Sequence, residues 1–436
     1  MMALRPAMTE ADPRPIAAIV LAAGKGTRMN SATHKVLHPI AGRPMIEHLL
    51  ASLAELAPAR TVVVVGEGRE QLEAALAGFE GDVLVLYGDV PFVRGATMRA
   101  MIERLRADDL PEAVVLAFEP DDPLQYGRVI AAGDRISWMV EHKDADEGQR
   151  ACRLCNSGLL AARSDALFAL LARVGNDNAQ REYYLPEIVN IAVADGRICA
   201  VITTDDPDEV AGINSRAELA AAEARWQRAR RARAMDEGAT LVAPETVFFS
   251  WDTRLGRDVT VEPNVVFGPA VDVADGVVIH AFSHLEGARL ASGASVGPFA
   301  RLRPGAVLEQ GAKVGNFVEM KNAVLGEGAK ASHLTYLGDA TVGAGANIGA
   351  GTITCNYDGY FKHRTEIGPG AFIGSNSALI APVSIGADAI VAAGSAVSRD
   401  VADGELRMVR AEQLVKPGWA DRFHDAMKRK KAEAKK

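Results

Sequence analysis

The chain has 436 residues, which is enough for two or three domains. Its 48% hydrophobic and 24% charged residues are ordinary for a soluble globular protein, and its net charge of −8 argues against a general nucleic-acid binder. The apolar stretch 16–23 is too short to cross a bilayer and lacks a cleavage site, so we expect neither a membrane span nor a signal peptide.

Four cysteines in so long a chain favour a reducing compartment, and we expect a cytoplasmic protein. Cys152 and Cys155 form a C-x-x-C pair, but no second pair completes a zinc site. We interpret them as two incidental thiols.

The N-terminal part reads as an α/β domain. Residues 1–15 form a lead-in, and 16–21 form a buried parallel strand that runs into Ala22-Ala23-Gly24-Lys25-Gly26-Thr27-Arg28, with Lys35 shortly after. A strand followed by a glycine-rich turn and basic residues is typical of a phosphate-binding site at the edge of such a sheet. The turn has neither the Walker spacing nor the G-x-G-x-x-G pattern.

Further elements continue this pattern. We expect a strand at 61–65, a helix at 69–76, and strands at 83–87 and 114–118. The strand at 83–87 ends in Gly88-Asp89, where an α/β sheet binds its ligands. One carboxylate there suits Mg²⁺, although a helix N-cap is an equally good interpretation of Asp89.

Polar loops follow at 126–129, 141–144 and 156–158, and the charges of 141–144 are by default a solvated run. Residues 214–234 are rich in Ala, Glu and Arg and predict a helix, part of a connector over 214–237 that joins the domain 16–213 to the rest. We expect the second domain over 238–410 and a basic, solubilising or disordered tail over 411–436.

The second half repeats an aliphatic or aromatic residue every six positions. A period of six fits neither a helix nor a simple strand, and it is typical of a parallel β-helix whose aliphatic residues fill a narrow core. The repeated positions are Leu255, Val261, Phe267, Val273, Ile279, Leu290, Val296, Leu302, Leu308, Val314, Met320, Ile367, Ile373, Leu379, Ile385, Val391 and Val397.

The repeat is interrupted at 279–290, at 322–336 and by an insertion at 356–363. His333 is a plausible general base because histidine titrates near neutral pH, and Arg303, Lys321 and Lys362 could bind a phosphorylated substrate. Any one of these residues alone is more simply a surface residue, but the cluster favours a site. Its polar members are Arg303, Glu319, Lys321, His333, Tyr336, Asn347, Asn356, Tyr357 and Lys362.

The motifs LAAGKGTRM, YGDVPF, VEHKDA, GPFARLRPGA, VGNFVEMKNA and SHLTYLGDATVGAGANIGAGTITCNYDG resemble the family of bifunctional N-acetylglucosamine-1-phosphate uridyltransferases / glucosamine-1-phosphate acetyltransferases. The resemblance covers nearly the whole chain. It implies a Rossmann-like nucleotidyltransferase domain, a connector helix and a left-handed β-helix that makes UDP-N-acetylglucosamine for cell-wall peptidoglycan and lipopolysaccharide. It also implies a homotrimer with the acetyl site between subunits.

In the N-terminal half, the resemblance implies that UTP, N-acetylglucosamine 1-phosphate and Mg²⁺ meet. Asp89 and Asn214 would hold the metal. The UTP and UDP-sugar contacts would come from Leu21, Ala22, Ala23, Gly24, Lys25, Arg28, Lys35, Tyr87, Gly88, Asp89, Gly127, Glu141, Asn156 and Asn214.

In the β-helix half, the resemblance implies that His333 takes a proton from glucosamine 1-phosphate as its amine attacks acetyl-CoA. The sugar phosphate would be held by Arg303, Lys321, Tyr336, Asn347 and Lys362. Acetyl-CoA would be held by Asn356, Tyr357, Ser375, Ala393 and Arg410.

Two departures from the family stand out. Only residues 66–82 separate the strands at 61–65 and 83–87, where the family has a further strand and helix that hold the uracil base. Arg181 replaces a small or flexible residue. The alternative to a bifunctional enzyme is therefore an acetyltransferase whose N-terminal domain is inactive or only binds ligands.

Overall fold

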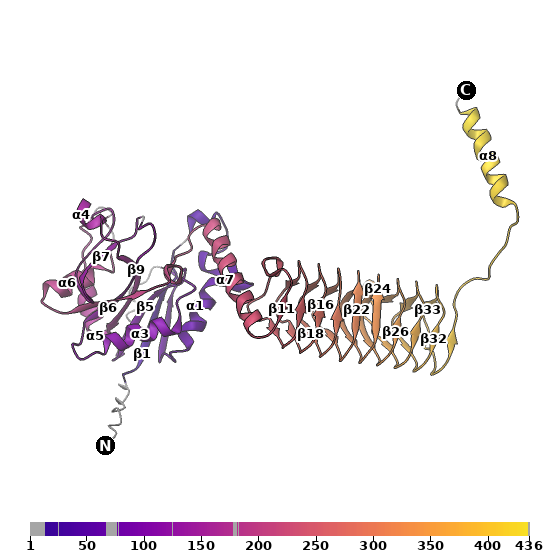
Figure 1. Ribbon diagram of the computed structural model, residues 1–436, viewed down its shortest axis with the longest axis horizontal. Helices are drawn as coiled ribbons and strands as arrows, with labels where there is room; N and C mark the ends of the chain where they lie inside the picture. The colour runs from indigo at the N-terminus through magenta and orange to yellow at the C-terminus, as the bar shows by residue number, and fades with distance from the viewer. Residues whose placement is uncertain are drawn as a thin grey trace, which may run out of the picture. The chain divides into compact units, whose positions relative to one another are not determined.

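The computed structural model describes residues 14–24, 26–66, 76, 78–123, 125–177, 181 and 183–434. The chain divides into two compact units, Met1–Gln227 and Arg228–Lys436. Each unit has its own sheet system (Figure 1). No helix within the described ranges is long and apolar enough to cross a membrane.

The N-terminal unit is an eight-stranded mixed sheet in the order β4-β1-β5-β9-β6-β10-β8-β7. Strand β1 pairs in parallel with β4 and β5, β10 pairs in parallel with β6, and β9 runs antiparallel to β5 and β6. The strands are β1 (Ile16–Leu21), β4 (Arg60–Val64), β5 (Asp82–Tyr87), β6 (Ala113–Phe118), β7 (Arg128–Ala132), β8 (Arg135–Val140), β9 (Cys155–Arg163) and β10 (Cys199–Thr204), with a small hairpin of β2 (Pro39–Ile40) and β3 (Arg43–Pro44).

Helices cover both faces of this sheet because alternate strand residues are apolar on either side. Ala18 and Val20 of β1 belong to the same core as α1 (Met45–Ala54) and α3 (Gly95–Leu105). Ala17 and Ile19 belong to the core formed with α5 (Ser164–Leu171) and α6 (Glu187–Ala194). The unit also contains α4 (Glu147–Arg150) and the 3₁₀ helices η1 (Thr27–Met29), η2 (Lys35–Leu37) and η3 (Pro207–Val210).

The predicted strands at 16–21, 61–65, 83–87 and 114–118 are confirmed to within one residue at either end as β1, β4, β5 and β6. The predicted helix at 69–76 lies outside the described residues apart from Leu76. Strand β4 is the edge of the sheet, so the sheet forms without the further strand that the related family carries.

The predicted helix at 214–234 is observed as α7 (Arg216–Asp236). The tail was expected to be a solubilising or disordered end. Residues 419–433 form an exposed helix, α8 (Trp419–Glu433), in which Trp419, Phe423 and Met427 recur at helical spacing.

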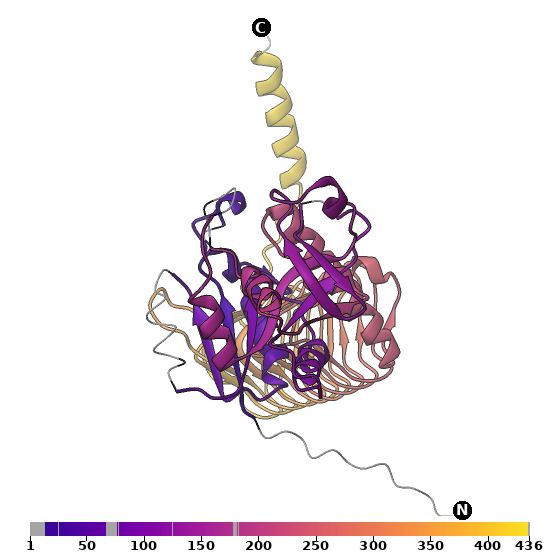
Figure 2. The ribbon, with the colours of Figure 1, turned by 90° about the vertical axis from the view of Figure 1, so that its left-hand side faces the viewer.

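The C-terminal unit is a parallel β-helix with three ladders of short strands, and its successive coils superpose when viewed along its axis (Figure 2). One ladder runs through ten strands, and strands β23 and β25 turn a corner and link the other two ladders.

The first ladder consists of β11 (Thr240–Leu241), β13 (Thr260–Val261), β16 (Val278–Ile279), β19 (Ser295–Val296), β22 (Lys313–Asn316), β24 (Lys330–His333), β26 (Asn347–Ile348), β29 (Phe372–Ile373), β32 (Ile390–Val391) and β34 (Leu406–Arg407). The other two ladders consist of β12 (Arg254–Leu255), β14 (Val266–Phe267), β15 (Asp272–Val273), β17 (His284–Leu285), β18 (Ala288–Leu290), β20 (Arg301–Leu302), β21 (Ala306–Leu308), β23 (Glu319–Leu325), β25 (Tyr336–Val342), β27 (Ile353–Cys355), β28 (Thr365–Ile367), β30 (Ala378–Ile380), β31 (Val383–Ile385) and β33 (Ala396–Val397). The 3₁₀ helix η4 (Pro244–Thr246) lies in the first coil.

The six-residue period predicted the core of this β-helix. Every residue of the predicted series is buried except Leu255, which is half-buried in the first coil. Paired registers such as Val296↔Val314 and Ile373↔Val391 stack these side chains directly above one another. The core is therefore built from columns of aliphatic residues, as the repeat requires.

Candidate functional site

The glycine-rich turn and the Tyr87-Gly88-Asp89 motif lie together at the ends of β1 and β5. Leu21 and Tyr87 are register partners, and the Gly88 N–H donates to the Leu21 carbonyl at 2.9 Å. A Cβ at position 88 would lie 3.2 Å from Val36 Cγ1 and 3.3 Å from Ala22 Cβ, so glycine allows these loops to approach closely.

Three residues from distant parts of the chain meet beside this turn. The Lys35 ammonium contacts Asp89 Oδ2 and donates to Asn214 Oδ1 at 3.0 Å. The Ile213 N–H donates to the Asp89 carbonyl at 2.9 Å, which holds Asn214 next to Asp89. We name Lys35, Asp89 and Asn214 the cation cluster.

The remaining described residues of the predicted phosphate site lie just before η1 or within it. Ala23 and Gly24 are exposed, and Arg28 is exposed within η1. Gly26 has φ 61°, and a Cβ there would lie 2.7 Å from Lys35 Cβ, so the turn packs directly on the lysine stem. Lys25 lies outside the described residues.

The predicted sugar-site residues also converge. The Asn156 N–H donates to the Gly127 carbonyl at 2.9 Å, and a Cβ on Gly127 would lie 3.2 Å from Glu141 Oε1. The Gly158 N–H donates to Asn156 Oδ1 at 2.9 Å. Gly158 has φ 85° and lies against the Tyr87 ring, where a Cβ would come within 2.8 Å, so no other residue fits there without displacement.

Burial perturbs the ionisable groups of this region. Desolvation, followed by the charge of Asp144, raises the pKa of the Glu141 carboxyl. Desolvation also raises the pKa of the Tyr87 phenol, with smaller effects from Asp89 and Glu141. Both groups therefore favour their neutral forms more than they would in water.

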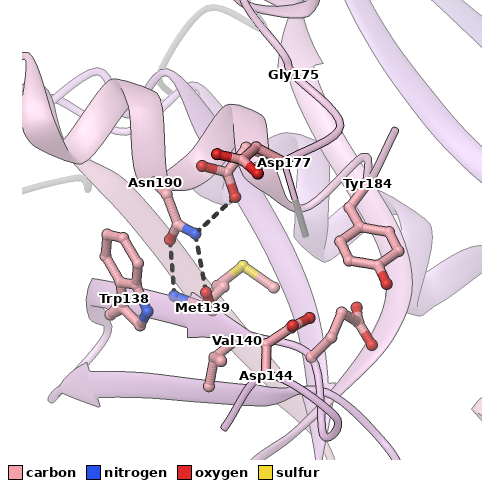
Figure 3. A pocket seen from close by; sticks show the side chains of 10 residues that line it. Trp138, Met139, Val140, Asp144, Gly175, Asp177, Tyr184 and Asn190 are labelled. Carbon is pink, nitrogen blue, oxygen red and sulfur yellow. Dashed lines mark hydrogen bonds between the residues drawn. The ribbon is translucent and has the colours of Figure 1, made fainter. Parts of the chain in front are cut away.

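A cavity of about 350 Å³ opens beside Glu141 (Figure 3). Two of its lining residues are hydrogen-bonded to each other. The Asn190 side chain, on α6, accepts from the Met139 N–H at 2.8 Å and donates to the Met139 carbonyl at 2.9 Å. The cavity is lined by Trp138, Met139, Val140, Glu141, Asp144, Gly175, Asp177, Tyr184, Glu187 and Asn190.

Sequence reasoning identified Glu141 but missed most of the other lining residues. Asn190 was detectable in principle, since a polar residue within the apolar run 188–194 requires a buried partner. Arg181, near this cavity in sequence, has φ 56°, a conformation that glycine adopts more easily than arginine. This agrees with the small or flexible residue expected at that position.

In the β-helix, His333 pairs in register with Asn316 one coil earlier. The His333 Nδ1 atom is hydrogen-bonded to Asn316 Oδ1, and His333 is exposed. Because an amide oxygen can only accept, Nδ1 carries the proton and Nε2 is left as a proton acceptor. His333 therefore has the tautomer that a general base needs.

The three predicted positive charges also come together. The contact with Lys362, and then the charges of Lys362 and Arg303, lower the pKa of the Lys321 ammonium. Arg303 is partly balanced by Glu319, which accepts from Arg303 Nη1 at 2.7 Å. Such a concentration of like charge is suited to a phosphate.

Asp339 lies beside this cluster and was not singled out from the sequence. Burial opposes its ionisation, but hydrogen bonds from Asn322 and Asn356 and the nearby lysines hold the pKa of Asp339 below its ordinary value. Asn322 Nδ2 donates to Asp339 at 2.6 Å, and Asn356 Nδ2 donates to its other oxygen. Asp339 thus anchors Asn356 at the base of the insertion.

The other predicted residues are spread over several coils. Tyr336 pairs in register with Glu319 on one neighbouring coil and with Ile353 on the other. Asn347 lies on the first ladder, where its register partners are Lys330 and Phe372. Tyr357 is exposed and bridges to Lys362 across the insertion.

Of the predicted acetyl-CoA residues, Asn356 and Tyr357 lie beside Asp339 and Lys362, whereas Ser375, Ala393 and Arg410 lie near the C-terminal coils. Arg410 Nη1 donates to the Ala393 carbonyl at 2.9 Å, and the Gly394 N–H donates to the Ser375 carbonyl at 2.8 Å. Among the described residues, no hydrogen bond or ion pair joins His333 to Lys321 or to Arg410.

Sequence comparisons match both halves. The family described as "MobA-like NTP transferase domain" matches residues 18–82, and "Bacterial transferase hexapeptide (six repeats)" matches residues 364–399. A Sphingopyxis alaskensis protein named bifunctional protein GlmU is 70% identical, over 97% of this chain and 99% of its own length. The chain belongs to the bifunctional GlmU family.

Two more GlmU proteins support this assignment. The one from Novosphingobium aromaticivorans is 74% identical over 97% of this chain and 99% of its own length. The one from Zymomonas mobilis is 54% identical over 96% of this chain and 99% of its own length. Since these GlmU proteins are named bifunctional and match along both halves, they disfavour the alternative of a silent N-terminal domain.

The alignment with the Sphingopyxis GlmU extends over 448 positions. Because 97% of the 436 residues is about 423, about 25 of those positions have no residue in this chain. This is roughly the length of one helix, one strand and their turns.

Proposed function

We propose that the chain makes UDP-N-acetylglucosamine in two steps. The β-helix transfers an acetyl group from acetyl-CoA to glucosamine 1-phosphate, and the N-terminal unit then transfers a uridylyl group from UTP to the product and releases pyrophosphate. The observation that supports this most directly is that both polar clusters are assembled in one chain whose bifunctional relatives match it over nearly their whole length.

In acetyl transfer, His333 Nε2 would take a proton from the sugar amine as its nitrogen attacks the thioester carbonyl, and coenzyme A would leave as the thiol. Asn316 would keep the ring in the required tautomer. Arg303, Lys321 and Lys362, with Tyr336 and Asn347, would hold the sugar phosphate. Acetyl-CoA would contact Asn356, Tyr357, Ser375, Ala393 and Arg410.

In uridylyl transfer, an oxygen of the sugar phosphate attacks the α-phosphorus of UTP, and the chain's task is to position the reactants and neutralise charge. Gly24, Arg28 and the neighbouring turn would bind the triphosphate, with Lys25 and Lys35. Gly127, Glu141 and Asn156 would bind the sugar, and the peptide from Leu21 to Ala23 and from Tyr87 to Gly88 would complete the nucleotide contacts.

Asp89 and Asn214 fit Mg²⁺, because carboxylate and amide oxygens are the hard donors that this ion prefers, and the contacts of both with the Lys35 ammonium support a cation site here. Bound there, the ion would neutralise charge that develops on the phosphates. One carboxylate is sufficient where phosphate oxygens and water supply the other ligands.

The chain would act as a homotrimer in the cytoplasm. Phe282, Phe299, Phe317 and Leu334 form an exposed apolar stripe along the β-helix, and its rings stack at 4.9 Å and 5.2 Å. Phe317 follows Asn316 and Leu334 follows His333, so the stripe borders the proposed base. A second copy on this stripe would place an interface beside the acetyl site. The described cysteines are free thiols, which suits a reducing compartment.

The experiment that tests the two activities uses one purified sample. Pyrophosphate release is measured with UTP, N-acetylglucosamine 1-phosphate and Mg²⁺, and thiol release is measured with acetyl-CoA and glucosamine 1-phosphate. We expect both activities in the natural chain, and Asp89→Ala should lose at least about a hundredfold in pyrophosphate release while keeping acetyl transfer. Thiol release without pyrophosphate release from the natural chain would contradict the proposed uridylyl transfer.

A further inference from the structure

The Lys35 ammonium contacts both of the proposed metal ligands. It contacts Asp89 Oδ2 and donates to Asn214 Oδ1 at 3.0 Å, so it uses an oxygen of each proposed metal ligand. The side chains of Lys35 and Asp89 are only 12% and 16% exposed, which limits how far water can screen the contact.

The fold holds the lysine in this position from two directions. The Gly26 turn packs against the Lys35 stem, where even a Cβ would come within 2.7 Å. Asn214 is placed by the hydrogen bond from the Ile213 N–H to the Asp89 carbonyl. The cation cluster is therefore a built site that already contains one positive charge.

A divalent ion would compete with the ammonium at this site. The ammonium contacts Asp89 Oδ2 and Asn214 Oδ1, so an ion bound to the same two side chains would lie within a few ångströms of it, and two positive charges at that distance repel in a partly buried environment. We infer that Lys35 is an internal counter-ion, and that metal binding is an exchange in which Lys35 leaves Asp89 and Asn214. This inference rests on the proposed uridylyl transfer, because it concerns the metal of that reaction.

The exchange would connect metal binding to the nucleotide. Once displaced, the Lys35 ammonium is a mobile cation next to the glycine-rich turn, where the triphosphate would bind, and phosphate oxygens are its natural new partners. Lys35 would thus act in succession as counter-ion and as phosphate ligand. The metal-free protein would keep Asp89 paired, and it would bind a divalent ion weakly until the lysine is released.

The test measures Mn²⁺ binding to the full chain without nucleotide, by the electron paramagnetic resonance signal of free Mn²⁺. Lys35→Met removes the ammonium and keeps an unbranched stem. We expect this variant to bind Mn²⁺ at least about tenfold more tightly than the natural chain, since the ion no longer displaces a competing charge. Arg99→Met is the matched control, because it removes one positive charge from the exposed surface of α3 in the same unit.

Each outcome decides the inference. Arg99→Met should change the affinity by less than about twofold, and Asp89→Asn combined with Lys35→Met should lose the gain. Equal or weaker Mn²⁺ binding by Lys35→Met, or no binding by either protein, would overturn the counter-ion role. Failure of the proposed function is distinguishable: pyrophosphate release would be absent from the natural chain while Lys35→Met still gained Mn²⁺ affinity.

Discussion

Single residues carry the chemistry of both halves, and their neighbours set their states. In the proposed mechanism His333 acts as the base, and its Nδ1 is hydrogen-bonded to Asn316; the pKa of the Lys321 ammonium is lowered because Lys362 and Arg303 lie beside it. The residue types were visible in the sequence. Their partners Asn316 and Asp339 were not singled out, because an amide or a carboxylate on a β-helix surface is ordinary until its neighbour in the next coil is known.

At this scale we predict the effect of removing the base. His333→Ala should lower kcat for acetyl transfer by about 10²- to 10⁴-fold, the usual contribution of a general base. The measurement is thiol release under saturating substrates, with size-exclusion chromatography to show an unchanged assembly. His284→Ala, at an exposed position of β17, is the matched control and should keep full activity. A His333→Ala enzyme at the natural rate would exclude this role.

Individual elements are held by buried polar links as well as by apolar packing. Glu209 in η3 is 1% exposed and connects three elements. Its carboxylate accepts from the Arg94 N–H at 2.9 Å at the start of α3 and from Thr204 Oγ1 at 2.7 Å at the end of β10. Arg94 Nη2 also donates to Glu209 Oε2, at 2.6 Å.

Glu209 makes stability depend on pH. Burial opposes its ionisation, but hydrogen bonds from Arg94, Thr97 and Thr204 outweigh burial and hold the pKa of Glu209 below its ordinary value of 4.5. A depressed carboxyl pKa stabilises the fold above the unfolded-state pKa, and this contribution disappears as the pH falls through the folded-state pKa.

We therefore expect Glu209→Gln to lower the free energy of unfolding by about 1–3 kcal/mol at pH 7, because buried hydrogen bonds to a charged acceptor are lost. The difference from the natural chain should shrink as the pH falls below the ordinary carboxyl range. Urea unfolding of both proteins at several pH values measures it. A difference that is constant over the whole range would show that ionisation of Glu209 does not contribute.

At the scale of the whole molecule, the apolar stripe is a surface that a single chain leaves exposed to solvent. Phe282, Phe299 and Phe317 are each about half exposed, and large contiguous apolar surface on a soluble protein usually marks an interface. Their ring stacking aligns them into one straight edge. The stripe lies beside His333, so assembly and acetyl transfer should depend on each other.

We predict that Phe299→Asp dissociates the proposed trimer, because an interface would have to bury an unpaired carboxylate. The mass from light scattering should fall from three chains to one, and acetyl transfer should fall at least about tenfold while pyrophosphate release is kept. Phe299→Leu preserves the apolar contact and should remain trimeric. A trimeric, fully active Phe299→Asp protein would place the interface elsewhere.

The sequence by itself determined the β-helix, its core and the order of its parts. A six-residue repeat needs only neighbouring coils to bury its aliphatic residues, so a local pattern is enough to predict the packing. The strands β1, β5 and β6 were predictable for a similar reason, since continuous apolar runs are typical of buried parallel strands.

Only the tertiary structure decided which polar residues meet. Lys35 lies 54 residues from Asp89 and 179 residues from Asn214, and no local pattern predicts that one ammonium will contact both. The residues that line the cavity beside Glu141 also come from separate elements, and so do Glu209 and the Arg94 N–H that donates to it. Such contacts depend on how loops are placed at the ends of a finished sheet, and side-chain charge and burial therefore become known only once the sheet has formed.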